Sequence, residues 1–324
     1  GYGRTGSKLK DLFLDLVYSF KALRHSPKAD AIILNTIWSP ILLPLFKHKF
    51  KVSLYNVARF PKHQLGLYRS VDVLSCVSTA VYNCLVRQTP TMKHKACVIS
   101  NFIDTKTFSR RRTHVLPECP IVVYSGRVHR EKGLEMLVNA INNIHKTNNI
   151  SLKIIGAWDI EHGGSGIEYK TELSALADGW DINWVAPIYS PALLAEELDK
   201  CDIFCYPSIA EKGETFGVAP LEAMGLGIPT IVSNLDCFKD FIVNGENGLI
   251  FNHRSSAAID ELTEKIRLLI NNKELYGLIS EKSASSSRSF SIDNKAMDYL
   301  QLLDNLLLHH CIGFDEKTMK IVKL

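Results

Sequence analysis

Alternation of short apolar runs with helix-like segments is the feature that most restricts how this 324-residue chain can fold. In the first third of the chain, the apolar runs predict buried strands at residues 30–34, 51–55, 71–77 and 95–100. Apolar residues at helical spacing predict helices before and between these runs, at residues 9–23, 40–46, 61–68 and 79–86. Strands that alternate with helices in this way favour a parallel sheet with helices on both faces.

The same alternation restarts after a basic, structure-poor stretch at residues 109–120, which contains Pro117 and is typical of an interdomain linker. Further strands are predicted at residues 121–124, 151–155, 181–185, 202–206, 228–232 and 249–251. We therefore predict an α/β protein with two doubly wound domains. The expected boundaries are residues 1–119 for the first domain and linker, 120–290 for the second domain, and 291–324 for a closing helix and tail that pack back toward the first domain.

Residues 214–222 (ETFGVAPLE) carry the clearest chemical pattern. They follow a predicted strand and lead into a helix with Pro220 in its first turn, where its missing N–H costs nothing. A strand, a glycine-bearing loop and a helix N-terminus in succession offer backbone N–H groups to an anion or a polyhydroxylated ligand. Glu214 and Glu222 flank this N-terminus, and each ionised carboxylate can accept two hydroxyl hydrogens from a vicinal diol. A purely structural interpretation is also open, in which Glu214 caps the helix and Glu222 is a solvated helix residue.

The stretch resembles the signature of the retaining GT-B glycosyltransferases of family 4, a Glu followed by seven residues and a second Glu, around Phe-Gly and Pro-Leu-Glu-Ala-Met. The resemblance covers residues 28–308 and is most specific over residues 120–252. It implies the GT-B fold, with two Rossmann-like domains facing across a cleft. It also implies an enzyme that moves a hexosyl group from a nucleoside-diphosphate sugar to an acceptor.

Arg127 and Lys132 stand on the loop before a helix that Gly133 opens. Two cations beside a helix N-terminus make an electrostatic seat for a diphosphate. A departing diphosphate must be neutralised by a metal ion or by fixed cations, and the chain has no Asp-x-Asp pair placed to hold a metal there. We therefore expect no metal and no cofactor. By charge alone, a solvated loop would be the better interpretation of these two residues.

The resemblance also implies individual roles. The family's Gly-Arg-x-x-x-x-Lys-Gly loop contacts the donor diphosphate, which implies that role for Arg127 and Lys132. The first Glu of its signature sits at the donor sugar and the second holds the ribose, which correspond to Glu214 and Glu222, and residues 184–188 correspond to a loop along the base. The other donor-binding residues that it implies are Gly126, Ile188, Thr215, Phe216, Gly217 and Val218.

The first domain departs from the family pattern. The family's first lobe begins with a strand and a glycine-rich loop, and here no strand is predicted before the first helix. Roughly two strand–helix units, on the order of 60 residues, are missing by comparison with a full lobe, so we expect an N-terminally truncated first domain. Many family members carry a His after the second predicted strand, where this chain has Asn56, with Arg59 nearby. These two residues are expected on the acceptor side, although an Asn cannot act as a general base.

Charge is distributed unevenly along the chain. Residues 1–119 hold 19 Lys and Arg against 6 Asp and Glu, a net charge of +13, whereas residues 120–324 hold 19 against 28, a net charge of −9. A basic first half favours an anionic partner such as a membrane surface, a lipid diphosphate or a nucleic acid, or else is a solvated face without a ligand. We expect no nucleic acid, because the basic residues are scattered and lack an aromatic platform.

No apolar run reaches the ~20 residues that a membrane span needs. The eight scattered cysteines lack a Cys-x-x-Cys pair and are typical of buried thiols in a reducing compartment. We therefore expect a cytoplasmic protein, peripheral at the inner face of the plasma membrane.

The leading hypothesis is a retaining glycosyltransferase that uses a UDP- or GDP-sugar. Its acceptor would be a glycan or a lipid-linked glycan, in the biosynthesis of a bacterial surface polysaccharide or lipopolysaccharide. The alternative is a non-catalytic remnant that still binds a nucleotide-sugar through the second domain.

Overall fold

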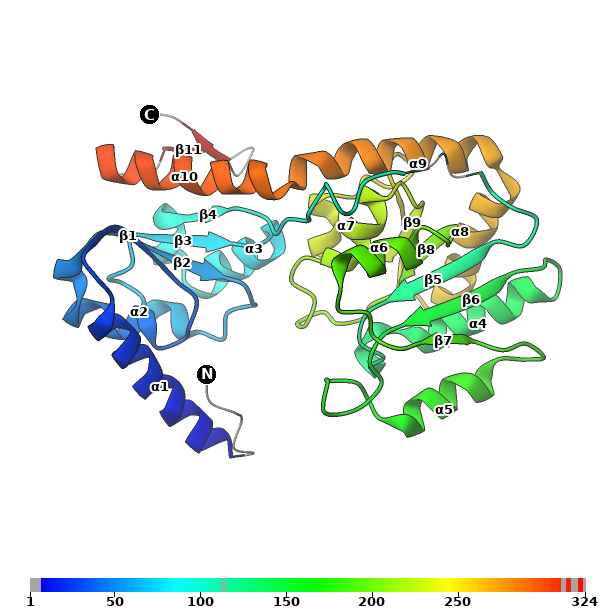
Figure 1. Cartoon of the computed structure of the whole chain (residues 1–324), viewed down its shortest axis with the longest axis horizontal. Coiled ribbons are helices and arrows are strands. Elements are labelled where there is room, and N and C mark those ends of the chain that lie inside the picture. The colour runs from blue at the N-terminus through cyan, green and yellow to red at the C-terminus, as the bar shows by residue number, and fades with distance from the viewer. Residues whose placement is uncertain (1–6, 112, 114, 310–312, 316–319, 323–324) are drawn as a thin grey trace. The chain divides into compact units, whose positions relative to one another are not determined.

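The computed structural model describes residues 7–111, 113, 115–309, 313–315 and 320–322. It divides into two compact units (Figure 1). The first unit comprises residues 1–101 and 295–324, and the second unit comprises residues 102–294.

The first unit is built on a parallel sheet. Its strands pair in the order β1 (Ala29–Leu34), β2 (Phe50–Val57), β3 (Val73–Cys76) and β4 (Ala96–Val98). Its described helices are α1 (Lys8–His25), α2 (Ser39–Leu42) and α3 (Thr79–Gln88), with 3-10 turns η1 (Leu43–Leu45), η2 (Lys47–Lys49), η3 (Gln64–Leu67) and η4 (Pro90–Lys95). A short antiparallel pair, β11 (Gly313–Asp315) and β12 (Lys320–Val322), follows near the C-terminus.

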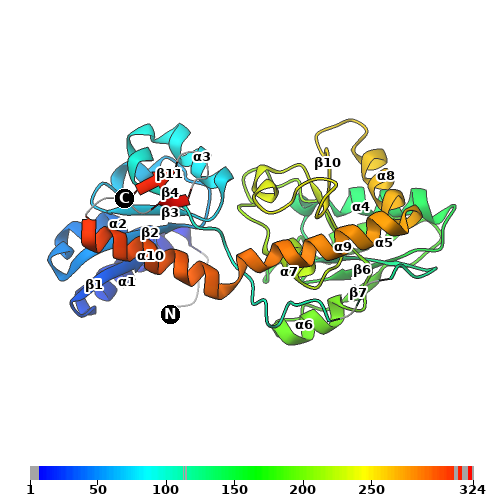
Figure 2. The ribbon, with the colours of Figure 1, turned by 90° about the horizontal axis from the view of Figure 1, so that it is seen from above.

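Helix α10 (Ile292–His309) lies along one face of this sheet (Figures 1 and 2). Its fully buried Leu302 packs with Leu54 of β2 and Val73 of β3 in one apolar cluster. The closing helix was expected to return to the first domain, and its residues from 295 onward belong to the first unit.

The second unit is a larger parallel sheet with helices on both faces. Its strands are β5 (Ile121–Ser125), β6 (Ser151–Ile155), β7 (Asn183–Val185), β8 (Ile203–Tyr206), β9 (Thr230–Ser233) and β10 (Leu249–Phe251). Its described helices are α4 (Leu134–His145), α5 (Ile167–Leu176), α6 (Pro191–Leu198), α7 (Val218–Gly225), α8 (Ala258–Asn271) and α9 (Lys273–Ser287), with 3-10 turns η5 (Arg130–Lys132), η6 (Asp236–Asp240) and η7 (Arg288–Phe290). The strand order is β7-β6-β5-β8-β9-β10, so the direction of winding reverses between β5 and β8.

Residues 102–108, which precede the expected linker, pack on the second unit. An added Cβ at Gly225, at the end of α7, would meet the carbonyl oxygen of Phe108 at 2.5 Å, so glycine allows this close approach. Ile103 and Phe108 are both buried, and the N–H of Ile103 donates to the carbonyl oxygen of Phe290. The first unit ends at residue 101 on this side, and residues 1–119 were expected to hold the first domain together with its linker.

One predicted helix is wrong. Residues 61–68 form only the short turn η3, and the described backbone explains why. His63 adopts a left-handed conformation with φ 65°, which interrupts any helix there. The other predicted strands and helices form within a few residues of their expected bounds.

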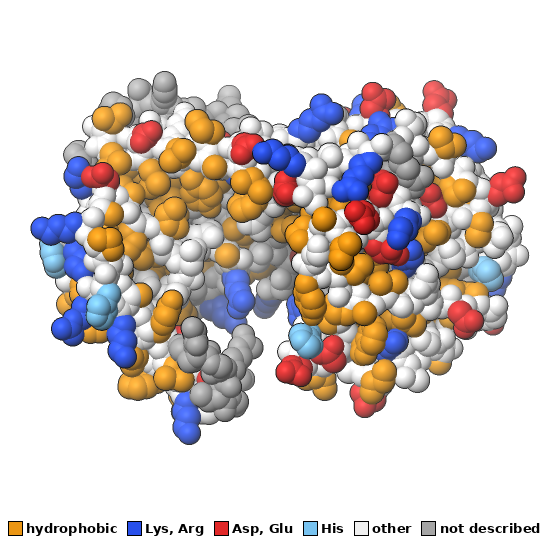
Figure 3. All heavy atoms as spheres, viewed as in Figure 1, with side chains coloured by type: hydrophobic (Ala, Val, Ile, Leu, Met, Phe, Trp, Pro, Cys, Tyr) orange, Lys and Arg blue, Asp and Glu red, His pale blue; other side chains and the backbone are white. Residues whose placement is uncertain are grey.

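The structure bears on three expectations from composition: membrane-spanning helices, the state of the cysteines and the distribution of charge. In the described part of the chain, no helix is both long and apolar enough to cross a membrane. The seven cysteines described there are free thiols, most of them buried, while Cys311 lies outside the described residues. On the face shown in Figure 3, basic side chains predominate among the charges of the first unit, and both signs are interspersed on the second.

Candidate active site

The candidate site lies where the strand order of the second unit reverses. β5 and β8 are neighbours, yet β5 is followed by β6 on one side and β8 by β9 on the other. In parallel sheets of this kind, ligands bind beyond the carboxyl ends of the strands at such a switch point. The loop after β5 carries Arg127 and Lys132, and the loop after β8 carries Glu214. The topology thus brings together residues that the sequence supplied as separate motifs.

Lys132 and Glu214 form a buried ion pair between these two loops. The Nζ of Lys132 lies 2.7 Å from Oε2 of Glu214, and the side chains are only 6% and 11% exposed. The same Nζ lies 5.4 Å from the ring centroid of Tyr206, the last residue of β8. Glu214 is therefore held by Lys132, and the N-cap residue of α7 is Gly217, which has no side chain with which to cap the helix.

Two tyrosines pack beside this pair. The rings of Tyr124 and Tyr206 stack with their centroids 5.4 Å apart. The hydroxyl of Tyr124 donates to the carbonyl oxygen of Arg127 at 2.8 Å. Burial, with the nearby charge of Glu214 adding to it, raises the pKa of both tyrosine hydroxyls well above the ordinary value, so both stay neutral near pH 7.

Arg127 is oriented by groups from two segments. Its Nη1 donates to the carbonyl oxygen of Gly163 at 2.9 Å, and its Nη2 donates to Oε1 of Glu131 at 3.0 Å. The side chain is 48% exposed, so further N–H groups of the guanidinium face solvent. Preceding it, the N–H of Gly126 donates to the carbonyl oxygen of Ile155 in β6, which ties the loop to the sheet.

Gly133 allows the Lys132 loop to approach the end of β8. Its φ is +66°, and an added Cβ would lie 2.3 Å from the carbonyl oxygen of Pro207. A residue with a side chain would be strained there and would also collide with backbone. Glycine at this position therefore lets α4 begin close enough to β8 for Lys132 to reach Glu214.

The start of α7 has the predicted form of a ligand-facing helix N-terminus. Gly217 has φ +97°, and an added Cβ would lie 2.5 Å from the ring of Phe238. Phe216 is buried against Phe241, with ring centroids 5.1 Å apart, whereas Val218 is 37% exposed. The segment from Thr215 to Val218 is thus held by packing on one side, with its backbone at the carboxyl edge of the sheet.

Glu222 lies in α7, one turn beyond this N-terminus, and is partly buried. Burial raises the pKa of its carboxyl to about 7. It is therefore not the solvated helix residue of the purely structural interpretation.

Residues 184–188 lie at the same edge but farther along the sheet. They comprise the last two residues of β7 and the three that follow it, and β7 is two strands, about 10 Å, away from β5. Trp184 makes an edge contact with Trp158, and Nζ of Lys170 lies 3.6 Å from the ring centroid of Trp158. Ile188 is partly buried and lies beyond the carboxyl end of β7.

Asn56 and Arg59 belong to the first unit. Asn56 is at the carboxyl end of β2, opposite Ser75 of β3, and its buried Oδ1 has no hydrogen-bond partner among the described residues. Arg59 is exposed in the segment that follows. Their position at a carboxyl edge is compatible with a ligand-facing role.

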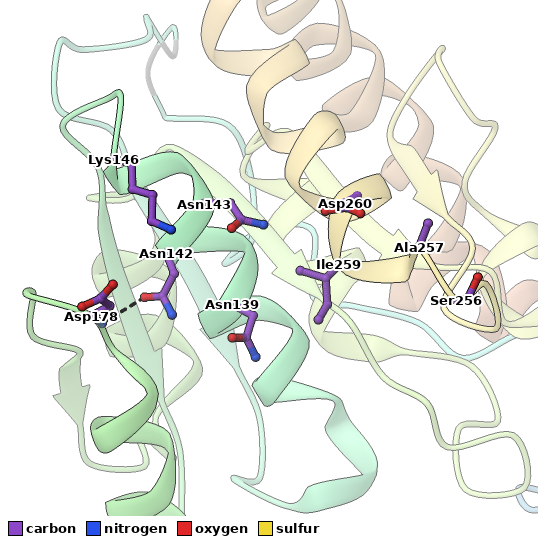
Figure 4. Close-up of a pocket in the computed structure, with 9 residues that line it drawn as sticks. All are labelled: Asn139, Asn142, Asn143, Lys146, Asp178, Ser256, Ala257, Ile259 and Asp260. Carbon is purple, nitrogen blue, oxygen red and sulfur yellow. Dashed lines mark hydrogen bonds between the residues drawn. The ribbon is translucent and has the colours of Figure 1, made fainter.

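A separate polar hollow of about 380 Å³ lies between α4 and the start of α8 (Figure 4). The amide oxygen of Asn142 accepts from the N–H of Asp178 at its rim. Helix α4 begins at the carboxyl edge of the sheet, next to Lys132, and runs back to the opposite edge. Lys146 follows the end of α4 and therefore lies at that opposite edge. The hollow is thus distinct from the candidate site, and its lining residues are Asn139, Asn142, Asn143, Lys146, Asp178, Ser256, Ala257, Ile259 and Asp260.

Glu131, Tyr124 and Tyr206 were not predicted from the sequence as site residues. Tyrosine in an apolar strand carries no sequence signal beyond core packing. For Glu131, the available signal was its position in the sequence between Arg127 and Lys132. However, an acidic residue is not expected to bind a diphosphate, so its role became visible only from its contact with Arg127 in the structure.

The sequence profile described as "Glycosyl transferases group 1" matches residues 105–285, more than half of the chain. The chain belongs to this family. Among curated proteins similar to this chain, the sulfoquinovosyl transferase of Arabidopsis thaliana is 23% identical over 268 residues, which cover 78% of this chain and 47% of that protein. A capsular polysaccharide biosynthesis glycosyltransferase of Staphylococcus aureus is 26% identical over 174 residues, which cover 53% of this chain and 42% of that protein. The present chain therefore spans about half the length of these two curated relatives.

Solved structures show that the fold is GT-B. Sucrose-phosphate synthase from Thermosynechococcus elongatus superposes with a TM-score of 0.75 at 19% identity, covering 94% of this chain and 80% of that one. HepE of Anabaena, solved in complex with UDP-glucose, superposes with a TM-score of 0.73 at 15% identity, covering 92% of this chain and 84% of that one. The prediction of two Rossmann-like α/β domains of the GT-B type is confirmed.

Proposed function

We propose that this chain is a retaining glycosyltransferase that takes a hexosyl group from a UDP- or GDP-sugar. The observation that carries the proposal is the assembly of Arg127, Lys132 and Glu214 at the switch point of the second unit. It sets two cations suited to a diphosphate beside a carboxylate suited to sugar hydroxyls. Membership of the group 1 family and the UDP-glucose complex of HepE support a nucleotide-sugar donor.

In the proposed reaction, the bond between the anomeric carbon and the diphosphate oxygen breaks. The acceptor hydroxyl oxygen forms the new bond on the same face of the sugar. The bonding electrons leave with the diphosphate, whose growing charge Arg127 and Lys132 stabilise. The leaving phosphate oxygen takes the acceptor proton, so Asn56 need not act as a base.

The remaining residues bind the donor in this proposal. Glu214 accepts hydrogen bonds from the sugar hydroxyls, and Glu222 accepts them from the ribose. The backbone from Thr215 to Val218 donates to sugar or phosphate oxygens. Gly126 lets the diphosphate approach the loop, and Ile188 lies along the base.

We also propose that the reaction uses no metal ion or other cofactor. The support is the pair of fixed cations at the site, which supply the positive charge that a metal would otherwise bring.

The acceptor and location belong to the same proposal. A glycan or lipid-linked acceptor at the cytoplasmic face of a bacterial plasma membrane would suit the excess of basic residues in the first 119 residues. The capsular polysaccharide enzyme among the relatives supports a role in surface polysaccharide biosynthesis. Asn56 and Arg59 are then the first candidates for acceptor contacts.

Calorimetric titration with UDP and with GDP tests the donor site. At pH 8, where the Glu222 carboxyl is ionised, we expect micromolar binding of one nucleotide, weakened by about 1.5–3 kcal/mol in Glu222→Ala because a charged contact to the ribose is lost. Glu246→Ala, at an exposed turn of the same unit, is the matched control and should bind as the wild type does. Absence of binding by a folded wild-type protein would refute the proposed function.

A further inference from the structure

Glu131 makes contacts on both sides of the candidate site. Its backbone carbonyl accepts from the N–H of Ile209 at 2.9 Å and from Oγ of Ser208 at 3.4 Å, which fastens the loop after β5 to the loop after β8. Its side chain is one-third exposed and reaches Arg127, with 3.0 Å between Oε1 and Nη2. The other carboxylate oxygen, Oε2, lies 3.3 Å from the position of an added Cβ at Gly213, the residue before Glu214.

The backbone of Glu131 is itself fixed. Its N–H donates to Nδ1 of His129 at 3.2 Å, at the start of the turn η5. The carboxylate is therefore presented from a turn that is anchored at both its N–H and its carbonyl group. The opposite side of the Arg127 guanidinium is held by the carbonyl oxygen of Gly163.

We propose that Glu131 is a positioning residue, which holds the Arg127 guanidinium in the orientation that receives the donor diphosphate. The inference rests on the proposed function. A half-exposed arginine has many rotamers, and ordering one of them at the moment of binding costs affinity. Two fixed acceptors, one from Gly163 and one from Glu131, remove that cost before the ligand arrives.

Glu131 has two opposing effects, and a pair of substitutions separates them. Its negative charge repels a nearby diphosphate, whereas its Oε1 orients Arg127. Glu131→Gln removes the charge and keeps an oxygen that can accept from Nη2. Glu131→Ala removes both the charge and the acceptor.

The experiment measures the dissociation constants of the full chain for UMP and UDP, or for GMP and GDP if the guanine nucleotides bind. The dissociation constant of the monophosphate divided by that of the diphosphate reports how much the second phosphate strengthens binding. A general loss of structure would weaken the binding of both nucleotides alike. We expect Glu131→Ala to reduce this ratio about 3- to 10-fold with little change for the monophosphate. Glu131→Gln should keep the ratio of the wild type or increase it.

A double-mutant cycle tests whether Glu131 acts through Arg127. In an Arg127→Ala background, Glu131→Ala should leave the diphosphate ratio unchanged. Arg130→Ala is the control from the same turn, because Arg130 pairs instead with Glu172, and it should match the wild type.

The outcomes distinguish this inference from the proposed function. If the wild type binds neither nucleoside diphosphate, the proposed function fails first. If the wild type prefers the diphosphate and Glu131→Ala keeps or increases that preference, the positioning role of Glu131 is wrong. If Glu131→Ala changes the ratio of dissociation constants equally in the wild type and in Arg127→Ala, Glu131 does not act through Arg127 and the inference is wrong.

Discussion

Because Lys132 and Glu214 are both buried, each charge depends on the other for its stabilisation. Each side chain has lost most of its hydration, and the 2.7 Å contact between them replaces part of what water provided. Removal of one partner leaves the other charge buried without compensation, which costs more than removal of both. The pair therefore contributes to the stability of the loops as well as to the proposed chemistry.

Urea denaturation can measure this dependence. We expect Lys132→Met to lower the free energy of unfolding by about 2–4 kcal/mol, and the double variant Lys132→Met/Glu214→Gln to recover much of the loss. Lys200→Met is the control, because its pair with Glu197 is exposed on the lysine side and should contribute at most about 1 kcal/mol. A Lys132→Met effect no larger than that of Lys200→Met would contradict this account.

Glu222 gives a second prediction for a single residue, on pH. Its pKa is about 7 in the folded protein against 4.5 as a free side chain, so the folded state binds the proton more tightly. Stability from this group is complete below about pH 4.5 and is lost as the pH rises to about 7, a change on the order of 2–3 kcal/mol. Glu222→Gln should remove this slope and be more stable than the wild type at pH 8. Unfolding at pH 5, 6.5 and 8 checks this, and parallel pH profiles for the two proteins would rule it out.

At the scale of elements, glycines decide how closely the loops and helices of the second unit approach. Gly133 and Gly179 both have left-handed backbones, but only Gly133 has backbone atoms where a Cβ would lie. This contact brings the start of α4 against the end of β8. The position of Lys132 thus follows from the packing of two elements.

Alanine substitutions at these two glycines form a matched pair. Gly179→Ala should cost about 1–2 kcal/mol from the left-handed backbone alone. Gly133→Ala should cost about 2–4 kcal/mol, since the backbone must also shift, and should weaken nucleotide binding as well. Thermal unfolding and UDP titration measure both effects. Equal costs and unchanged binding would show that the close approach at Gly133 does not matter.

For the whole molecule, the two units should respond differently to a nucleotide. The proposed diphosphate and sugar contacts lie in the second unit, and a ligand stabilises the part of the protein whose folded form it binds. We expect UDP, at a concentration 100 times its dissociation constant, to add about 2.7 kcal/mol to the free energy of unfolding of the second unit. Hydrogen exchange should slow at residues 126–133 and 207–222, with EDTA making no difference. Protection that requires a divalent ion would overturn the proposed metal independence.

Much of the fold could be predicted from the sequence, because buried parallel strands and amphipathic helices leave local patterns. The runs that became β5, β6 and β8 were visible as apolar segments, and α1 was visible from its helical spacing. The helix expected at residues 61–68 failed because the left-handed backbone of His63 depends on context that local spacing does not record.

The strand–helix alternation and the candidate site residues Arg127, Lys132, Glu214 and Glu222 could be predicted from local patterns along the chain. Only the tertiary structure decided that Lys132 pairs with Glu214, that Glu131 holds Arg127, and that burial raises the pKa of Glu222. The physical reason is that these properties arise between segments far apart in the chain. Lys132 and Glu214 are 82 positions apart, and they meet because β5 and β8 are neighbours in the sheet.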